Sequence, residues 1–217
     1  MNALIYAPAG GGKTVNSTLV EGKRNLLLNS DNSHIVLNNF KRDNLNILTI
    51  KHWLPTDIKG NAQECFDSIF DAAVDSKKYD NIIVDNLSDL IDLAVLECDE
   101  QGRIKDPRQY YFEVYKSIKR LVRKAAQFDC NVVFTAWHDI IEFTFPNGEY
   151  GKRIQPKIPA KILDSVLGLC QIVGFVTSAD DNGTKRWYYA LEGTPTLYAK
   201  DQLYCRKSCL PEKLFTK

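Results

Sequence analysis

The feature that most constrains this chain is a glycine-rich octapeptide that directly follows a short apolar run. The run is Ala3-Leu4-Ile5-Tyr6, and the octapeptide is Ala7-Pro8-Ala9-Gly10-Gly11-Gly12-Lys13-Thr14. Glycines let the backbone turn tightly so that successive N–H groups point at one bound anion, and a helix that begins there adds its positive end. The order of strand, loop, Lys-Thr and helix is typical of a phosphate-binding loop, in a relaxed form with Ala7 at the first glycine position.

Two side chains complete the chemistry expected of this loop. Lys13 supplies a mobile positive charge to the β- and γ-phosphates of a nucleoside triphosphate, and the Thr14 hydroxyl takes one position on Mg²⁺. The sequence therefore predicts ATP and Mg²⁺ as cofactors. The residues expected to hold the nucleotide here are Ala9, Gly10, Gly11, Gly12, Lys13, Thr14 and Val15.

A second magnesium ligand is expected at the end of a later buried strand. The run Asn81-Ile82-Ile83-Val84-Asp85 fits that description, because three apolar residues lead into an acid. Such a run is common when it stands alone, but it gains meaning downstream of a phosphate loop. We therefore expect Asp85 to hold Mg²⁺ together with Thr14.

Hydrolysis requires a further group that orients or deprotonates the attacking water. Asp31 follows the apolar run Leu26-Leu27-Leu28 at the end of a predicted strand, where it acts either in hydrolysis or in capping a turn. The polar end of another core strand offers Thr135 or His138 as a sensor of the γ-phosphate, and a solvent-exposed His138 fits the sequence equally well. We place Thr135 in the nucleotide site.

The chain length of 217 residues suits one domain, and apolar runs alternate with amphipathic stretches as in βαβ units. We expect a single α/β domain over 1–217, with a nucleotide-binding core (1–138) whose mainly parallel sheet is flanked by helices. An extension of the same domain (139–217) is expected to add antiparallel hairpin strands joined through Asp181-Asn182-Gly183. The predicted strands are Ala3–Ala7, Asn25–Asn29, Asn46–Ile50, Asn81–Asp85, Asn131–Thr135, Ile140–Phe145, Gln171–Ser178 and Lys185–Leu191. The predicted helices are Lys13 to about Glu21, Ile58–Asp75, Leu87–Cys98, Gln109–Phe128 and a short one that ends a loop from Pro156 to Gly168.

Composition narrows the class of protein. Hydrophobic residues make up 44% and charged residues 25%, which is the balance of a globular chain and not of a disordered one. The sequence has neither a signal-peptide pattern nor a run of about 18 apolar residues, so we expect a cytoplasmic protein without a membrane partner. Its six cysteines form no C-x-x-C pair, which argues against structural zinc and a disulfide framework.

A formal net charge of +1 gives no whole-chain case for nucleic-acid binding, so any such case must be local. The segment from Glu149 to Lys161 combines cations with Tyr150, which suits single-stranded DNA, and its prolines predict a loop. The helix from Gln109 carries a second basic face, which we interpret as an ordinary solvated face. The cations of the two segments are Lys152, Arg153, Lys157 and Lys161, and Lys116, Lys119, Arg120, Arg123 and Lys124.

In combination, these motifs resemble the RecA-like P-loop ATPases of bacteriophages, of the Sak-four type associated with single-strand annealing and recombination. The resemblance implies a RecA-like fold, ATP hydrolysis stimulated by single-stranded DNA, a homo-oligomer with composite ATP sites, and a place in the host cytoplasm. A phage single-strand-binding or annealing protein is implied as a further partner. The segments that carry the resemblance are Leu4–Thr14, the strand ending at Asp31, Tyr79–Leu87, Val132–Trp137 and Ala199–Asp201.

The resemblance assigns three catalytic residues, and two of them depart from the family pattern. Lys13 matches the pattern. The acid after the second strand is typically Glu in relatives and is Asp31 here, one methylene shorter, so we expect a slow enzyme. Relatives also carry Lys-x-Arg near the C-terminus, which reaches the γ-phosphate of a neighbouring subunit. Here the triplet is Lys200-Asp201-Gln202, so action in trans rests on Lys200 alone.

Two other functions are compatible with a phosphate loop. A small-molecule kinase for nucleosides or nucleotides would need an Arg-rich lid and an acceptor pocket, and the sequence shows no clear lid. A nucleotide-gated interaction protein would bind ATP in order to control a partner. Both remain alternatives to the ATPase.

Overall fold

The computed structural model describes residues 1–40, 42–49, 76–100, 106–145 and 148–217. The helix expected at Ile58–Asp75 lies outside these ranges. The strands are β1 (Asn2–Ala7), β2 (Asn25–Asn29), β3 (Leu45–Thr49), β4 (Asn81–Asp85), β5 (Asn131–Thr144), β6 (Tyr150–Pro156), β7 (Ile172–Asp181), β8 (Thr184–Ala190), β9 (Lys200–Asp201) and β10 (Ser208–Cys209). The helices are α1 (Lys13–Ser17), α3 (Leu87–Glu100), α4 (Pro107–Ala125) and α5 (Ala160–Gly168), and the 3₁₀ helices are η1 (Ser33–Asn39), η2 (Ser76–Lys78) and η3 (Pro211–Lys213).

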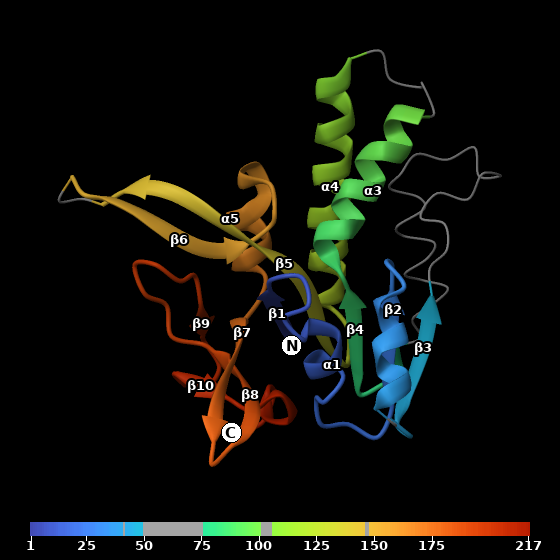
Figure 1. Ribbon diagram of the computed structural model, residues 1–217. Coiled ribbons are helices and arrows are strands. Elements are labelled where there is room, and N and C mark those ends of the chain that lie inside the picture. The colour runs from blue at the N-terminus through green and yellow to red at the C-terminus, as the bar shows by residue number, and fades with distance from the viewer. Residues whose placement is uncertain (41, 50–75, 101–105, 146–147) are drawn as a thin grey trace.

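The fold is organised by a sheet with the strand order β10-β8-β7-β1-β5-β4-β2-β3 (Figure 1). Its central strand β1 lies between β5 and β7 and is parallel to both. The pairs β5–β4, β4–β2 and β2–β3 are parallel as well. Parallel strands end at the same edge of a sheet, so the segments that follow β1, β2 and β4 meet at one place.

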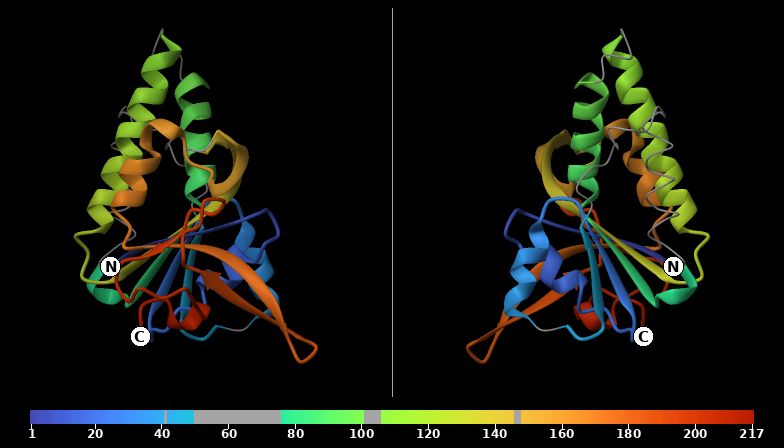
Figure 2. Two further views of the ribbon diagram at one scale, coloured as in Figure 1. Left: turned by 90° about the vertical axis from the view of Figure 1, so that its left-hand side faces the viewer. Right: turned by 90° about the vertical axis from the view of Figure 1, so that its right-hand side faces the viewer.

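Both faces of this sheet are covered. In β1, Leu4 and Tyr6 pack into the core beneath α3, α4 and α5, whereas Ala3, Ile5 and Ala7 pack into a second core on the opposite face. Figure 2 shows α3, α4 and α5 gathered on one side of the sheet, with α1 and η3 on the other side. Burial on both faces explains why the central strands appear in the sequence as continuous apolar runs.

A ladder of asparagines fixes the strands at the opposite, amino-terminal edge of the sheet. Asn131 Nδ2 donates to Asn81 Oδ1 at 3.0 Å, and Asn81 Nδ2 donates to Asn25 Oδ1 at 2.8 Å. Asn25 and Asn81 are fully buried, and they face each other in the β2–β4 register. Since a slip of one residue would break these amide pairs, the ladder specifies the register.

Helix α1 is shorter than expected, because it ends at Ser17 and not near Glu21. The Ser17 hydroxyl donates to the Thr14 carbonyl, and the Thr18 hydroxyl donates to the Val15 carbonyl. Hydroxyl groups that bond to nearby carbonyls in this way compete with the backbone pattern of a helix. The predicted end was therefore wrong for a local reason.

Helix α4 begins earlier than the expected Gln109. Asp106 caps it by accepting a hydrogen bond from the Arg108 backbone N–H at 3.0 Å, and Pro107 takes the first helical position. Proline suits that position because its missing N–H would have no partner there.

In the described part of the chain, no helix combines the length and the apolar character that crossing a membrane requires.

The expected strand Ile140–Phe145 is the distal half of the long strand β5. From His138 onward β5 pairs antiparallel with β6, and the two form a ribbon that projects from the body (Figure 1). The loop expected around Glu149 to Lys161 was therefore wrong in its first half. Pro156 is the last residue of β6, where the missing N–H of proline costs no further hydrogen bond between the strands.

The C-terminal hairpin is confirmed. Strands β7 and β8 pair antiparallel up to Asp181 and Thr184, and Asn182 and Gly183 turn the chain with φ values of 53° and 81°. Positive φ at both central residues is the geometry of a tight hairpin turn. With the mainly parallel sheet and its flanking helices, the expected α/β fold class is confirmed.

The asparagine ladder makes a testable contribution to stability. Replacing Asn81 by Ala removes the bonds to Asn25 and Asn131 and leaves buried polar groups without partners, so the free energy of unfolding should fall by about 1–3 kcal/mol. Asn46→Ala, at an exposed position of the edge strand β3, serves as the control and should stay within about 0.5 kcal/mol. Urea unfolding of both variants measures the difference, and equal losses would show that the ladder is dispensable.

Candidate nucleotide site

The phosphate loop adopts a conformation that its glycines make accessible. Gly10 and Gly12 have φ values of 72° and 79°, and the Gly11 N–H donates to the Pro8 carbonyl at 3.0 Å. A Cβ atom on Gly12 would lie 2.7 Å from Asn16 Nδ2, which donates to the Gly12 carbonyl. Gly12 is therefore required both by its backbone angle and by the close approach of Asn16.

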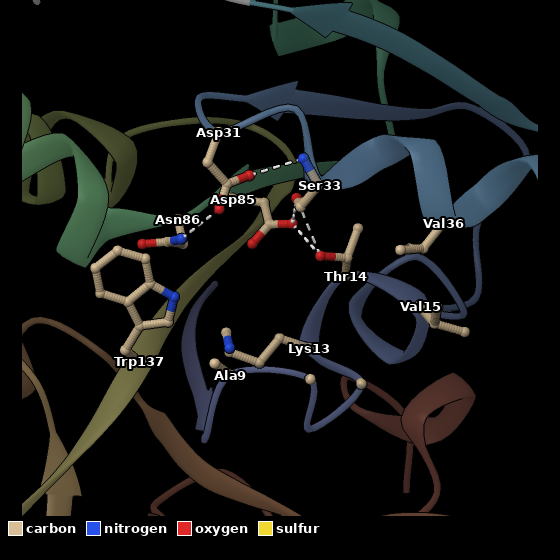
Figure 3. A pocket seen from close by; sticks show the side chains of 12 residues that line it. Ala9, Lys13, Thr14, Val15, Asp31, Ser33, Val36, Asp85, Asn86 and Trp137 are labelled. Atoms are coloured by element: carbon tan, nitrogen blue, oxygen red, sulfur yellow. Dashed lines mark hydrogen bonds between the residues drawn. The ribbon is translucent and has the colours of Figure 1, made fainter.

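The loop forms one wall of a cavity of about 340 Å³ at the carboxyl edge of the parallel strands. Figure 3 shows side chains from β4, from the segment after β2 and from the phosphate loop pointing into the same space. The lining residues are Ala9, Gly10, Gly12, Lys13, Thr14, Val15, Asp31, Ser33, Val36, Asp85, Asn86 and Trp137. The structure thus brings the expected loop, Asp31 and Asp85 together.

Asp85 lies at the centre of this site and is only 1% exposed. Its Oδ2 atom accepts hydrogen bonds from the Thr14 hydroxyl at 2.5 Å and the Ser33 hydroxyl at 2.9 Å, and its Oδ1 atom accepts one from the Thr135 hydroxyl. Burial raises the pKa of Asp85, and the three hydroxyls act against that rise. The hydroxyls compensate part of the cost of burying a carboxylate.

Lys13 is 7% exposed and lies beside the loop carbonyls. Its Nζ atom donates to Pro8 O at 3.1 Å and to Ala7 O at 3.4 Å. Burial lowers the pKa of Lys13, whereas the carboxylates of Asp85 and Asp31 raise it. The cavity therefore combines one ammonium with two carboxylates, a balance that suits an anionic ligand carrying its own divalent cation.

Asp31 projects into the cavity from the segment just beyond β2. Its Oδ1 atom accepts a hydrogen bond from the Ser33 backbone N–H at 2.9 Å, and its Oδ2 atom accepts one from Asn86 Nδ2 at 2.9 Å. The first bond closes a turn, which is the purely structural role that the sequence left open as the alternative to hydrolysis. The second fixes the carboxylate beside the end of β4, and Asp31 remains exposed to solvent.

Thr135 is expected to contact the nucleotide, but it lies deeper in the protein than the cavity wall. It is fully buried, its hydroxyl donates to Asp85, and it is absent from the residues that line the cavity. His138, the other candidate sensor, begins the β5–β6 ribbon opposite Pro156 and lies outside the lining as well. Thr135 therefore contacts the site through Asp85, and its action on the nucleotide stays a prediction.

Five residues near the site were missed by the sequence reasoning. Ser33 contacts Asp85, and Val36, Asn86 and Trp137 line the cavity. Ser33 follows an aspartate by two residues, which is the spacing of a side-chain-closed turn and could have revealed it. Trp187 belongs to β8, and its ring lies 3.8 Å from where a Cβ on Gly12 would stand. No local sequence signal connects that hairpin with the loop.

Lys200 lies away from the cavity of its own chain. It pairs with Val173 in the β7–β9 ladder, at the level of Leu4 in β1, whereas the phosphate loop follows the far end of β1. Its Nζ atom donates to Gln202 Oε1 at 3.1 Å. An action of Lys200 on the nucleotide of a neighbouring subunit stays a prediction.

Three of the four cations in the segment from Glu149 to Lys161 have a partner within the chain. Lys152 Nζ lies 3.7 Å from Glu142, Lys157 Nζ lies 3.1 Å from Asp92, and the Arg153 guanidinium lies 4.6 Å from the centre of the Phe143 ring. Tyr150, by contrast, is 90% exposed.

The donor atoms of the site fit Mg²⁺, which prefers oxygen ligands and is bound through one or two carboxylates together with substrate phosphates. Asp85 supplies the carboxylate, and the Thr14 hydroxyl lies against it. Within the described ranges, no cluster of three His, Cys, Asp or Glu residues forms a separate metal site. Thr14 and Asp85 are thus the protein ligands that this arrangement offers to a nucleotide-bound cation.

A glycine-rich loop at the carboxyl edge of a parallel sheet, with a lysine and a buried acid facing it, defines a P-loop nucleotide-binding protein. The chain belongs to the AAA domain family, whose model matches residues 1–203, and it is therefore a P-loop ATPase of the AAA type.

Two solved structures are similar to this chain at 11% identity. A KaiC-like protein from the archaeon Pyrococcus horikoshii has a TM-score of 0.49, with 87% of this chain and 76% of that chain covered. The flagellar accessory protein FlaH from Methanocaldococcus jannaschii has a TM-score of 0.47, with 95% and 82% covered. No curated protein matches the chain.

The position of Thr135 yields a prediction that separates two roles. If Thr135 holds Asp85, Thr135→Val should weaken Mg²⁺-dependent binding of ADP and of a non-hydrolysable ATP analogue alike, by about 10- to 100-fold, as for other groups that orient a metal ligand. Calorimetric titrations at several Mg²⁺ concentrations measure this effect. A loss confined to the ATP analogue would instead identify Thr135 as a γ-phosphate sensor.

Proposed function

We propose that this protein is an ATP-hydrolysing recombination protein of a bacteriophage, of the Sak-four type, that assembles on single-stranded DNA and is stimulated by it. The observation that carries hydrolysis is the convergence of Lys13, Asp85 and Asp31 on one cavity. The recombination role rests on the motif resemblance, in the order and spacing of the segments from Leu4 to Asp201. Membership of the AAA domain family agrees with the ATPase part.

Different residues of the site are proposed to bind the phosphates and the cation. Lys13 neutralises the β- and γ-phosphates, while backbone N–H groups of Gly10 to Thr14 surround the phosphate oxygens. Thr14 and Asp85 hold the cation. Mg²⁺ supplies positive charge that stabilises the negative charge developing on the transferred phosphoryl group. The hydroxyls of Ser33 and Thr135 orient the Asp85 carboxylate toward that task.

Asp31 is proposed to orient and deprotonate the attacking water. Its bonds to the Ser33 N–H and to Asn86 limit the rotation of the carboxylate while leaving it exposed at the cavity wall. A group that takes a proton in the transition state contributes about 10²- to 10⁴-fold to the rate. Because Asp is shorter than the Glu of relatives, slow turnover is expected.

Lys200 is proposed to complete the site of a neighbouring subunit in a homo-oligomer. Its place beside Val173 in the β7–β9 ladder, outside the cavity lining of its own chain, supports action in trans and disfavours action in cis. The turn after it is held by Asp201, whose Oδ1 atom accepts the N–H groups of Leu203 and Tyr204 at 3.0 Å. Lys200 thus stands on β9, directly before an ordered turn.

At the β5–β6 ribbon, single-stranded DNA is proposed to make a stacking contact. Tyr150 offers an exposed ring on which a base can stack, a contact worth about 1–3 kcal/mol that tolerates any sequence. A phage single-strand-binding or annealing protein would act beside it on the same DNA. The kinase alternative lacks support in the described residues, since the cavity lining contains no arginine that would belong to a lid.

The role of Asp31 can be tested by Asp31→Asn. The amide cannot accept the proton of the water, so turnover should fall by about 10²- to 10⁴-fold while the Kd for ATP changes little. Phosphate release and calorimetry measure the two quantities, and Asp139→Asn, an exposed residue outside the cavity, is the matched control. Retained hydrolysis in Asp31→Asn would assign this residue to the turn alone.

A mixing experiment tests Lys200. Lys200→Ala should bind ATP normally yet hydrolyse it poorly in the assembled form, because a cation reaching the γ-phosphate across an interface stabilises developing charge. Mixed with Asp31→Asn, it should regain activity, since some interfaces would pair an intact Asp31 with an intact Lys200. A mixture that co-assembles but stays as inactive as its parents would rule out action in trans.

A further inference from the structure

A groove of about 430 Å³ lies between α4 and α5, away from the nucleotide cavity. The two helices lie side by side on the same face of the sheet (Figure 2). One wall comes from α4 and is basic, while the other comes from α5 and is neutral. The lining residues are Lys116, Lys119, Arg120, Arg123, Ser165 and Leu169.

The basic wall follows from the spacing of residues along α4. Positions 116, 119, 120 and 123 are separated by three, four and seven residues, which places them on one flank of a helix. The apolar residues Val114, Ile118 and Leu121 occupy the buried flank. The four cations therefore form a line of about 10 Å along the groove, given a rise of 1.5 Å per residue.

The sequence indicated a solvated face for this helix, and Lys119, Arg120 and Arg123 are indeed exposed. The structure adds that these cations and Lys116 share one concave surface with Ser165 and Leu169. A concave wall of one sign of charge concentrates the field and attracts counter-ions.

The charge of the groove is largely uncompensated. Lys116 lies 3.9 Å from Glu113, a distant and partly exposed pair. In the ranges that the structure describes, no carboxylate lies within ion-pair distance of Lys119, Arg120 or Arg123. In the β5–β6 ribbon, Lys152 lies 3.7 Å from Glu142, and Lys157, just beyond β6, lies 3.1 Å from Asp92. Among the described residues, the groove has three cations without an acid partner and the ribbon has one, Arg153, so the groove is the stronger candidate for a polyanion.

We propose that the α4–α5 groove binds the sugar-phosphate backbone of single-stranded DNA, an inference that rests on the proposed function. A line of cations, as opposed to a ring around one point, matches a repeating polyanion. At about 3.4 Å per phosphate along one strand, the line spans roughly three phosphates. The Ser165 hydroxyl adds a neutral donor to the opposite wall.

Lys161 extends this path along α5. It lies one helical turn before Ser165 and so projects from the same flank of the helix. Lys161 is exposed, and α5 begins at Ala160, shortly after β6 ends at Pro156. A strand that leaves the groove along Lys161 therefore runs toward the base of the ribbon.

The test compares two charge-reversal variants of the full chain by fluorescence anisotropy with a labelled oligothymidine over a range of salt concentrations. The groove variant is Arg120→Glu with Arg123→Glu, and the matched ribbon variant is Lys152→Glu with Arg153→Glu. All four residues lie outside the nucleotide site, so ATP binding without DNA should be unchanged in both variants. Thermal unfolding verifies that each variant is folded.

The groove variant should lose at least tenfold in affinity, and the slope of log K against log salt should flatten by about 1.4, or about 0.7 for each lost phosphate contact. The ribbon variant should keep most of its affinity and most of the salt slope. If the groove variant binds like the wild type while the ribbon variant loses binding, the groove is overturned and the proposed function stands. If the wild type fails to bind the oligonucleotide at any salt concentration, the DNA part of the proposed function fails.

Discussion

The buried carboxylate of Asp85 is the interaction on which the rest of the site depends. An ionised acid with almost no access to water is costly unless its oxygens are hydrogen-bonded. Here Thr14 comes from the phosphate loop, Ser33 from the segment after β2, and Thr135 from β5. One acid therefore ties three separate segments together, and it can do so only where parallel strands end at a common edge.

The order of the strands explains how these segments reach one another. Strand β5 lies between β1 and β4, so Thr135 stands beside Asp85 on the side toward the phosphate loop. Strand β2 lies on the other side of β4 and delivers Asp31 and Ser33. The asparagine ladder secures the opposite ends of the same strands, so the register that brings the site together is specified at both edges of the sheet.

Much of this arrangement could be predicted from the sequence, because the phosphate loop, the strand ending at Asp85 and the Asn182-Gly183 turn are local patterns. The sequence could not place Thr135, since a hydroxyl at a strand end suits either a nucleotide or a neighbouring acid, and the choice depends on strand order. The groove was missed for a related reason. The charges of α4 are visible in the sequence, but the packing of α5 beside α4 depends on the tertiary structure. The loop expected around Lys152 failed because pairing with β5 decides its structure.

We propose that this cavity hydrolyses ATP and that single-stranded DNA accelerates the reaction. The most direct measurement is phosphate release by the purified protein from ATP with Mg²⁺, with and without single-stranded DNA, beside a set of nucleosides as phosphoryl acceptors. We expect slow, Mg²⁺-dependent release of inorganic phosphate that rises with DNA and leaves the nucleosides unphosphorylated. Transfer of the phosphoryl group to a nucleoside, or tight ATP binding with no phosphate released under any condition, would contradict it.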